Sequence, residues 1–245
     1  MSFATDVVDW FADPAHWTGP DGVPSRLVEH LEITGLTVLI AAVVALPVGL
    51  WLGHLGRGGA LATGVSYIGR AAPTYAVLVL LAISPPPFGN NQTSTVTALV
   101  LFALSPILTN TYVGIRGVDP DAVDAARGMG LSGWQVLRQV ELPLAAPLVI
   151  SGLRLATTQV IATATIAALV AGGGLGRIIT AGFGRQDDAQ LFAGALLVAL
   201  LALFAELVLG GLQRSSARRA RPDVAARRPP PLTGAPGDGA GLTVP

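Results

Sequence analysis

Residues 119–147 read DPDAVDAARGMGLSGWQVLRQVELPLAAP, and they form the longest polar interval between strongly apolar segments of the chain. Apolar stretches of about 20 residues, long enough to cross a bilayer, are found on both sides. The interval is therefore predicted to be a loop between two membrane spans. Small side chains at Ala122, Ala125 and Ala126 would let another protein approach closely. The alternative is an amphipathic loop that lies on the lipid headgroups.

The first part of this loop predicts a short helix that ends in a glycine elbow. Asp119 can cap the helix, and Pro120 suits its first position because an N–H there would be unpaired in any case. We expect the helix to run to about Arg127. Gly128 and Gly130 then supply the permissive backbone that ends a helix.

The second part predicts another short helix. Ser132, followed three residues later by Gln135, is a capping-box pattern. Pro143 disfavours helix at the residue before it, so we expect the helix to stop there. Apolar residues recur on one face of this segment, at Trp134, Leu137 and Val140.

The composition indicates a polytopic membrane protein. Of the 245 residues 51% are hydrophobic and 12% are charged, and the mean hydropathy is +0.61, which exceeds what a soluble domain needs for its core. The chain has no cysteine, which excludes disulfides, thiolate nucleophiles and Cys-ligated metals. All 15 basic residues are arginine, so the lysine of a P-loop is missing. Energy for any transport must come from a partner or from a gradient.

Five apolar stretches are expected to cross the membrane, at residues 33–53, 61–83, 95–115, 144–171 and 191–212. Arg70 and Pro73 interrupt the second stretch, which is either one kinked span, the reading we favour, or an interfacial helix followed by a span. Residues 1–32 lack the basic region and apolar core of a signal peptide. Residues 213–245 are rich in Arg, Pro and Gly, which predicts a disordered tail.

Arginine counts predict the orientation of the spans. With residues 116–143 inside, ten arginines lie on the inner side, and three lie outside at Arg26, Arg177 and Arg185. The N-terminus is therefore expected outside, and the C-terminus in the cytoplasm. A basic tail beside a membrane span marks the cytoplasmic face more often than a nucleic-acid site, so we expect no nucleic-acid partner.

A glycine run follows the fourth predicted span. It consists of Gly172, Gly173 and Gly174, then Leu175 and Gly176. It lacks the spacing of a dinucleotide fingerprint and follows a span rather than a strand. It is either a simple helix end or a hinge or close-packing point at an outer gate, where glycine lets backbones meet.

Five of the polar side chains within the predicted spans are candidates for a specific role: Arg70, Asn110, Tyr112, Arg154 and Glu206. Charges at this depth need a partner or water. Arg154 and Glu206 lie at similar depths, roughly 10 to 15 Å from the inner face at 1.5 Å per residue, so we predict an ion pair between them. Arg70 has no equally clear partner, and either lines a path or binds a backbone carbonyl. Asn110 and Tyr112 are expected to hydrogen-bond between helices, with substrate contact as the alternative.

The loop resembles the Glu-Ala-Ala loop of ATP-binding-cassette importer permeases. Its matching positions, with Asp for Glu and Val for Ile, are Asp124, Ala125, Ala126, Gly130, Val140, Leu142 and Pro143. Several stretches of the spans resemble the osmoprotectant branch, which imports glycine betaine, choline or carnitine: residues 46–49, 106–108 and 152–154. Residues 70–74 depart from the pattern of that branch, and Glu206 stands where Asp is expected.

This resemblance implies an all-α type I importer permease fold with about five transmembrane helices. It implies that the loop docks on a cytoplasmic ATPase, which would bind ATP and Mg²⁺, so that this chain is a non-catalytic subunit without a cofactor of its own. The expected partners are that ATPase, an extracytoplasmic substrate-binding protein and a second permease subunit, in a bacterial cell membrane. The alternatives are a permease of another importer branch, for methionine or polar amino acids, and a secondary transporter.

Overall fold

The computed structural model describes residues 2–60, 64, 73–86, 88–89, 91–170 and 172–220, and these contain helices but no strand. The N-terminal part holds α1 (Phe3–Ala12), the 3-10 turn η1 (Pro14–Trp17) and α2 (Val23–Leu55). The central part holds α4 (Thr74–Ala82), α5 (Asn91–Arg116), α6 (Pro120–Gly128), α7 (Gly133–Val136) and the π turn η2 (Leu137–Glu141). The last helices are α8 (Leu142–Ala167), α9 (Gly176–Arg185) and α10 (Asp188–Ala220).

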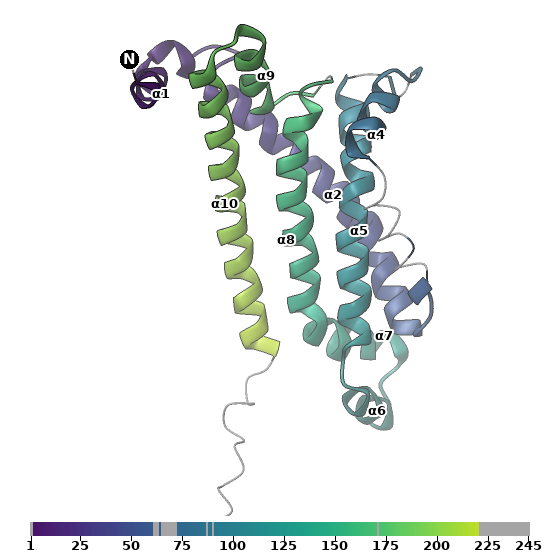
Figure 1. Cartoon of the computed structure of the whole chain (residues 1–245). Helices are drawn as coiled ribbons and strands as arrows, with labels where there is room; N and C mark the ends of the chain where they lie inside the picture. The colour runs from purple at the N-terminus through teal and green to yellow at the C-terminus, as the bar shows by residue number, and fades with distance from the viewer. Residues whose placement is uncertain are drawn as a thin grey trace, which may run out of the picture.

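The long helices form a bundle in which α10, α8 and α5 lie side by side and α2 crosses behind them (Figure 1). Helices α1 and α9 lie at one end of the bundle, and α6 and α7 at the other. The central core contains large aliphatic side chains such as Leu99 and Ile107, packed against alanines of α2 and α8. The bundle therefore has two distinct ends separated by an apolar middle.

Glycines allow the helices to approach closely where they cross. A Cβ added to Gly49 would lie 2.9 Å from Cβ of Thr111, and one on Gly53 would lie 2.7 Å from Cβ of Ile115. A Cβ on Gly152 would lie 2.9 Å from the carbonyl oxygen of Pro106. Small residues at helix crossings are typical of membrane bundles, in which close packing provides much of the attraction.

Four helical segments among the described residues are long and apolar enough to cross a membrane: Val23–Leu55, Gln92–Arg116, Gly133–Ala167 and Asp188–Arg218. They correspond to the first, third, fourth and fifth predicted spans. The second predicted span lies largely outside the described residues, including Arg70. Its described part, α4, has nine residues, which is short of the ~20 needed to cross.

The predicted helix break before Pro143 is wrong. Helix α7, the π turn and α8 follow one another without interruption from Gly133 to Ala167. Proline lacks an N–H, and in a regular α-helix its ring meets the carbonyl four residues earlier, here that of Gln139. Gln139 lies within the wider π turn. Pro47, Pro106 and Pro147 also lie inside long helices, so this bundle accommodates proline at several positions.

Helix α10 also runs further than expected. The tail predicted to be disordered from residue 213 is helical up to Ala220, and the rest of it lies outside the described residues. Arginine in the last turns is favourable because cations stabilise the negative end of the helix dipole.

Candidate functional site

The loop at residues 119–143 folds into the predicted helix pair, α6 and α7, at one end of the bundle (Figure 1). Oδ1 of Asp119 accepts a hydrogen bond from the Asp121 N–H over 3.0 Å, so Asp119 caps α6 as predicted. Gly130 has φ +85°, the left-handed backbone that the elbow requires. The Ser132 N–H donates to Oε1 of Gln135 over 2.8 Å, as expected of a capping box. Local sequence therefore determines this element.

The helix pair, which we call the coupling element (residues 119–143), has a buried side and an exposed side. Ala126 and Val136 are buried, with 2% and 0% of their surface exposed. Met129 and Trp134 are 75% and 68% exposed. The expected common apolar face is not observed, because Leu137 is buried whereas Trp134 is exposed. Large apolar side chains thus protrude from the end of the bundle.

The remaining positions of the Glu-Ala-Ala pattern are placed on both sides of the element. The carboxylate of Asp124 is exposed and lies 3.8 Å from the Arg127 guanidinium. Ala125 is exposed, whereas Ala126 is buried. Val140, Leu142 and Pro143 lie at the join between the π turn and α8, where Val140 and Leu142 are half-buried.

Sequence reasoning missed the contact that ties the coupling element to α2. Nδ1 of His54, in the last turn of α2, lies 2.6 Å from Oε2 of Glu141, and the Glu141 residue is 5% exposed. Gly133 also lies against His54, because a Cβ there would be 3.3 Å from Nε2. The position of Glu141, directly before Leu142 and Pro143, could have indicated a buried contact. Its partner could not be identified, because His54 is 87 residues away in the sequence.

The glycine run lies at the opposite end of the bundle and packs closely against the start of α2. The Gly174 N–H donates to Oε2 of Glu29 over 2.8 Å, and the Arg26 guanidinium donates to the same oxygen over 2.6 Å. A Cβ on Gly173 would overlap the Glu29 carboxylate at 1.8 Å, and one on Gly174 would lie 2.8 Å from Nδ1 of His30. The run therefore follows the end of α8 and also packs closely on α2, so a helix end and a close-packing point are combined here. A role as an outer gate stays a prediction.

Gly172 and Gly176 complete this packing point from the α8 side. A Cβ added to Gly172 would lie 2.8 Å from the carbonyl carbon of Ala167. A Cβ added to Gly176 would lie 2.7 Å from Cβ of Ala168. Both glycines therefore let the chain turn tightly over the end of α8.

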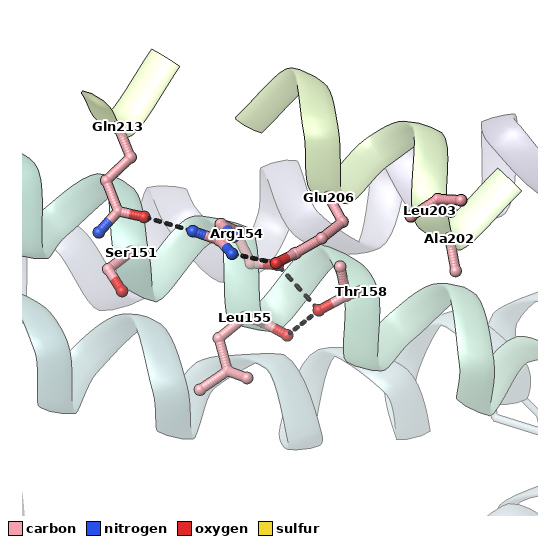
Figure 2. Close-up of a pocket in the computed structure, with 8 residues that line it drawn as sticks. All are labelled: Ser151, Arg154, Leu155, Thr158, Ala202, Leu203, Glu206 and Gln213. Atoms are coloured by element: carbon pink, nitrogen blue, oxygen red, sulfur yellow. Dashed lines mark hydrogen bonds and ion pairs between the residues drawn. The ribbon is translucent and has the colours of Figure 1, made fainter. Parts of the chain in front are cut away.

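The predicted ion pair between Arg154 of α8 and Glu206 of α10 is present (Figure 2). The other side of the guanidinium donates to Oε1 of Gln213 over 2.8 Å, a partner that the sequence reasoning did not predict. These side chains line a groove of about 600 Å³ between α8 and α10, together with Ser151 and Thr158.

Asn110 makes a hydrogen bond within its own helix and not the expected one between helices. Nδ2 of Asn110 donates to the Pro106 carbonyl one turn earlier in α5, over 2.8 Å. The Tyr112 hydroxyl lies near the loop after α2, where a Cβ on Gly59 would be 3.0 Å away. Arg70 lies outside the described residues.

These features define a multi-pass helical membrane protein with a protruding helix pair at one end of its bundle. The chain belongs to the family described as "binding-protein-dependent transport system inner membrane component", whose model matches residues 45–222. It is therefore a permease component of a transport system, in a family of inner-membrane proteins.

Curated relatives cover most of the chain. It is 34% identical to the "glycine betaine/carnitine/choline transport system permease protein OpuCB" of Bacillus subtilis (strain 168), over 76% of this chain and 84% of the relative. It is 35% identical to the "carnitine transport permease protein OpuCB" of Listeria monocytogenes, over 76% and 84%. It is 32% identical to the "osmoprotectant import permease protein OsmW" of Salmonella typhimurium, over 85% and 95%.

Solved structures share the fold. An inward-facing structure of the MetNI methionine ABC transporter matches with a TM-score of 0.69 at 20% identity, over 83% of this chain and 98% of the solved one. An amino acid ABC transporter with histidines matches with a TM-score of 0.62 at 21% identity, over 89% and 99%. The fold is that of type I ABC importer permeases, as the sequence predicted.

Proposed function

We propose that this chain is the transmembrane permease subunit of an ATP-driven importer for quaternary ammonium osmoprotectants such as glycine betaine, choline and carnitine. The similarity to two permeases named for glycine betaine, carnitine or choline and to one named for osmoprotectant import, each over at least three quarters of the chain, carries the proposal. The coupling element at one end of the bundle supports the ATP-driven part.

The coupling element would dock on a cytoplasmic ATPase subunit. Met129 and Trp134 protrude and would fill a recess of the partner, while the small side chain of Ala125 lets the partner approach the backbone. Exposed aromatic and methionine side chains of this kind are enriched at protein interfaces. ATP and Mg²⁺ would be bound by the ATPase, which leaves this chain a non-catalytic subunit.

Movement of the coupling element would pass into the bundle through two connections. The first is the uninterrupted helix from Gly133 to Ala167, which joins the element to α8. The second is the His54–Glu141 contact, which joins it to α2. Closure of the ATPase would therefore displace two spans together, as alternating access requires.

The opposite end of the bundle would face the cell exterior and receive substrate from a binding protein. The arginine counts support this orientation, with the coupling element inside and the packing point of Gly174 on Glu29 outside. A second permease subunit, identical or paralogous, would complete the pathway.

Uptake by reconstituted complexes tests the proposal. The chain is co-expressed with its ATPase and binding protein, and uptake of radiolabelled glycine betaine and choline into proteoliposomes is measured with ATP and with ADP inside. We expect uptake that requires ATP. ATP-dependent uptake of methionine or another amino acid, with neither osmolyte carried, would favour a different importer branch. Osmolyte uptake that is driven by an ion gradient without ATP would instead indicate a secondary transporter.

A further inference from the structure

The groove between α8 and α10 brings two charged side chains and two hydroxyl side chains together within the membrane-embedded bundle. Arg154 lies in the middle of α8 (Leu142–Ala167), and Glu206 lies near the middle of α10 (Asp188–Ala220). Their side chains are 34% and 38% exposed. Ser151 and Thr158 line the same groove, one turn before and one turn after Arg154 (Figure 2).

Lipid is an unsuitable neighbour for this surface. Charged side chains at mid-membrane depth face the interior of a bundle, a partner or a water-filled cavity, because hydrocarbon cannot solvate them. A third of each side chain in the Arg154–Glu206 pair remains uncovered by this chain. A volume of about 600 Å³ is within the range of small-molecule sites, so the groove can admit an osmolyte and water.

The charges of the groove match those of a zwitterion. Arg154 presents a planar fork of donors that suits a carboxylate, and Glu206 presents a carboxylate that suits a quaternary ammonium. When Arg154 and Glu206 release each other and bind a zwitterionic osmolyte such as glycine betaine or carnitine, all four charges remain paired. No isolated charge is then left in a medium where it would be costly. Such an exchange favours weak, reversible binding, which transport requires.

We propose that this groove is a contact site for the transported osmolyte, in which the substrate carboxylate binds Arg154 and its quaternary ammonium lies against Glu206. This inference rests on the function proposed above and adds the place where the permease itself touches the substrate. Gln213 is a positioning residue, because its hydrogen bond holds the guanidinium on the α10 side of the groove.

Thiol labelling tests whether the groove is open to water and substrate. The chain has no cysteine, so a single introduced cysteine reports one position. Ser151→Cys is nearly isosteric and lies in the groove, and Leu207→Cys is the control, because Leu207 is 64% exposed on α10 and does not line the groove. Thr158→Cys replaces Ser151→Cys if that variant does not assemble.

A charged methanethiosulfonate reagent that carries a trimethylammonium group is applied to the assembled complex during ATP turnover. We expect Ser151→Cys to react at least about tenfold faster than Leu207→Cys, because a thiolate forms in water and not in lipid. Saturating glycine betaine should slow the reaction at Ser151→Cys. Equal rates at both positions, or a rate that glycine betaine leaves unchanged, would overturn the proposal.

A substrate comparison tests the role of the guanidinium. Choline carries the quaternary ammonium but no carboxylate, so it does not use the fork of Arg154. Arg154→Lys keeps the charge and removes the fork. With the binding protein saturated, we expect the ratio of glycine betaine to choline uptake to fall by at least about threefold. A purely structural ion pair would lower both rates together and leave the ratio unchanged, which would refute the proposed contact. If wild-type complexes carried neither osmolyte, the proposed function itself would fail.

Discussion

Glu141 is the residue at which burial and charge conflict most clearly. The residue is 5% exposed, and Oε2 lies 2.6 Å from Nδ1 of His54. A buried carboxylate without a partner loses its solvation and gains nothing in return. The contact therefore fixes the coupling element against the end of α2.

Removal of His54 should destabilise the permease. His54→Ala leaves Glu141 unpaired, and we expect a loss of about 1–3 kcal/mol in the free energy of unfolding. The double variant His54→Ala/Glu141→Gln should recover part of this loss, because the glutamine carries no charge. Thermal unfolding of the detergent-solubilised protein measures both variants. A single variant as stable as the wild type would show that the contact contributes nothing.

Gly174 should tolerate no side chain. Its φ of +76° strains any residue with a Cβ, and that Cβ would lie 2.8 Å from Nδ1 of His30. We expect Gly174→Ala to cost about 1–3 kcal/mol of unfolding free energy and to lower the yield of folded protein. Gly184→Ala is the matched control, because an added Cβ there meets nothing within 4 Å. Equal yield and unfolding temperature for the two variants would contradict this packing.

Single-residue features were predictable where their partners are close in the sequence. The Asp119 cap and the elbow at Gly130 depend on backbone a few residues away. The contact of Glu29 with Gly174 joins residues 145 apart, and nothing local marks it. The Arg154–Glu206 pair is an exception, because depth in the membrane restricts which charges can meet.

At the scale of helices, the predicted break before Pro143 is wrong because the effect of proline on the preceding residue is a preference that helix packing overrides. Helices also continue past Pro47, Pro106 and Pro147, and these three prolines lie in regular α-helix and not in a π turn. Pro143 is therefore one of several prolines inside the long helices of this bundle. No residue pattern in this stretch distinguishes a π turn from a helix end.

The crossing of α2 and α5 should depend on Gly53. A Cβ there would lie 2.7 Å from Cβ of Ile115, so Gly53→Ala must push the two helices apart. We expect this overpacking to cost about 1–3 kcal/mol of unfolding free energy. Gly35→Ala, in the same helix with open space around it, should stabilise slightly or have no effect. The unfolding temperatures of the two variants measure this difference. A destabilised Gly35→Ala with an unaffected Gly53→Ala would rule out this crossing.

For the whole molecule, the proposed orientation places the coupling element in the cytoplasm. In the cysteine-free chain, Met129→Cys reports the coupling element and Val8→Cys reports α1, since both positions are exposed. We expect a membrane-impermeant thiol reagent to label Val8→Cys in intact spheroplasts and Met129→Cys in inverted vesicles. The reverse labelling would show that the chain has the opposite orientation, which would exclude docking of the coupling element on a cytoplasmic ATPase.

The fold class was predictable because the apolar spans and the Glu-Ala-Ala loop are local patterns. Such patterns stay recognisable after conservative replacements, such as Asp for Glu in this loop. The substrate is harder to infer. Arg154 and Glu206 were identified as an ion pair, but the groove around them depends on how α8 and α10 pack, and Gln213 was not recognised as a third partner.

If the coupling element transmits ATPase closure to transport, the shape of its glycine elbow must matter, and a pair of glycine variants tests this. Gly128 and Gly130 both have open space around an added Cβ, but Gly130 alone of the two has a positive φ. A β-branched residue at such a φ is strongly disfavoured. In reconstituted complexes, we predict that Gly130→Val lowers ATP-dependent osmolyte uptake at least about tenfold, whereas Gly128→Val lowers it less than about threefold. Uptake that falls equally in both variants, or in neither, would show that the elbow at Gly130 does not transmit ATPase closure.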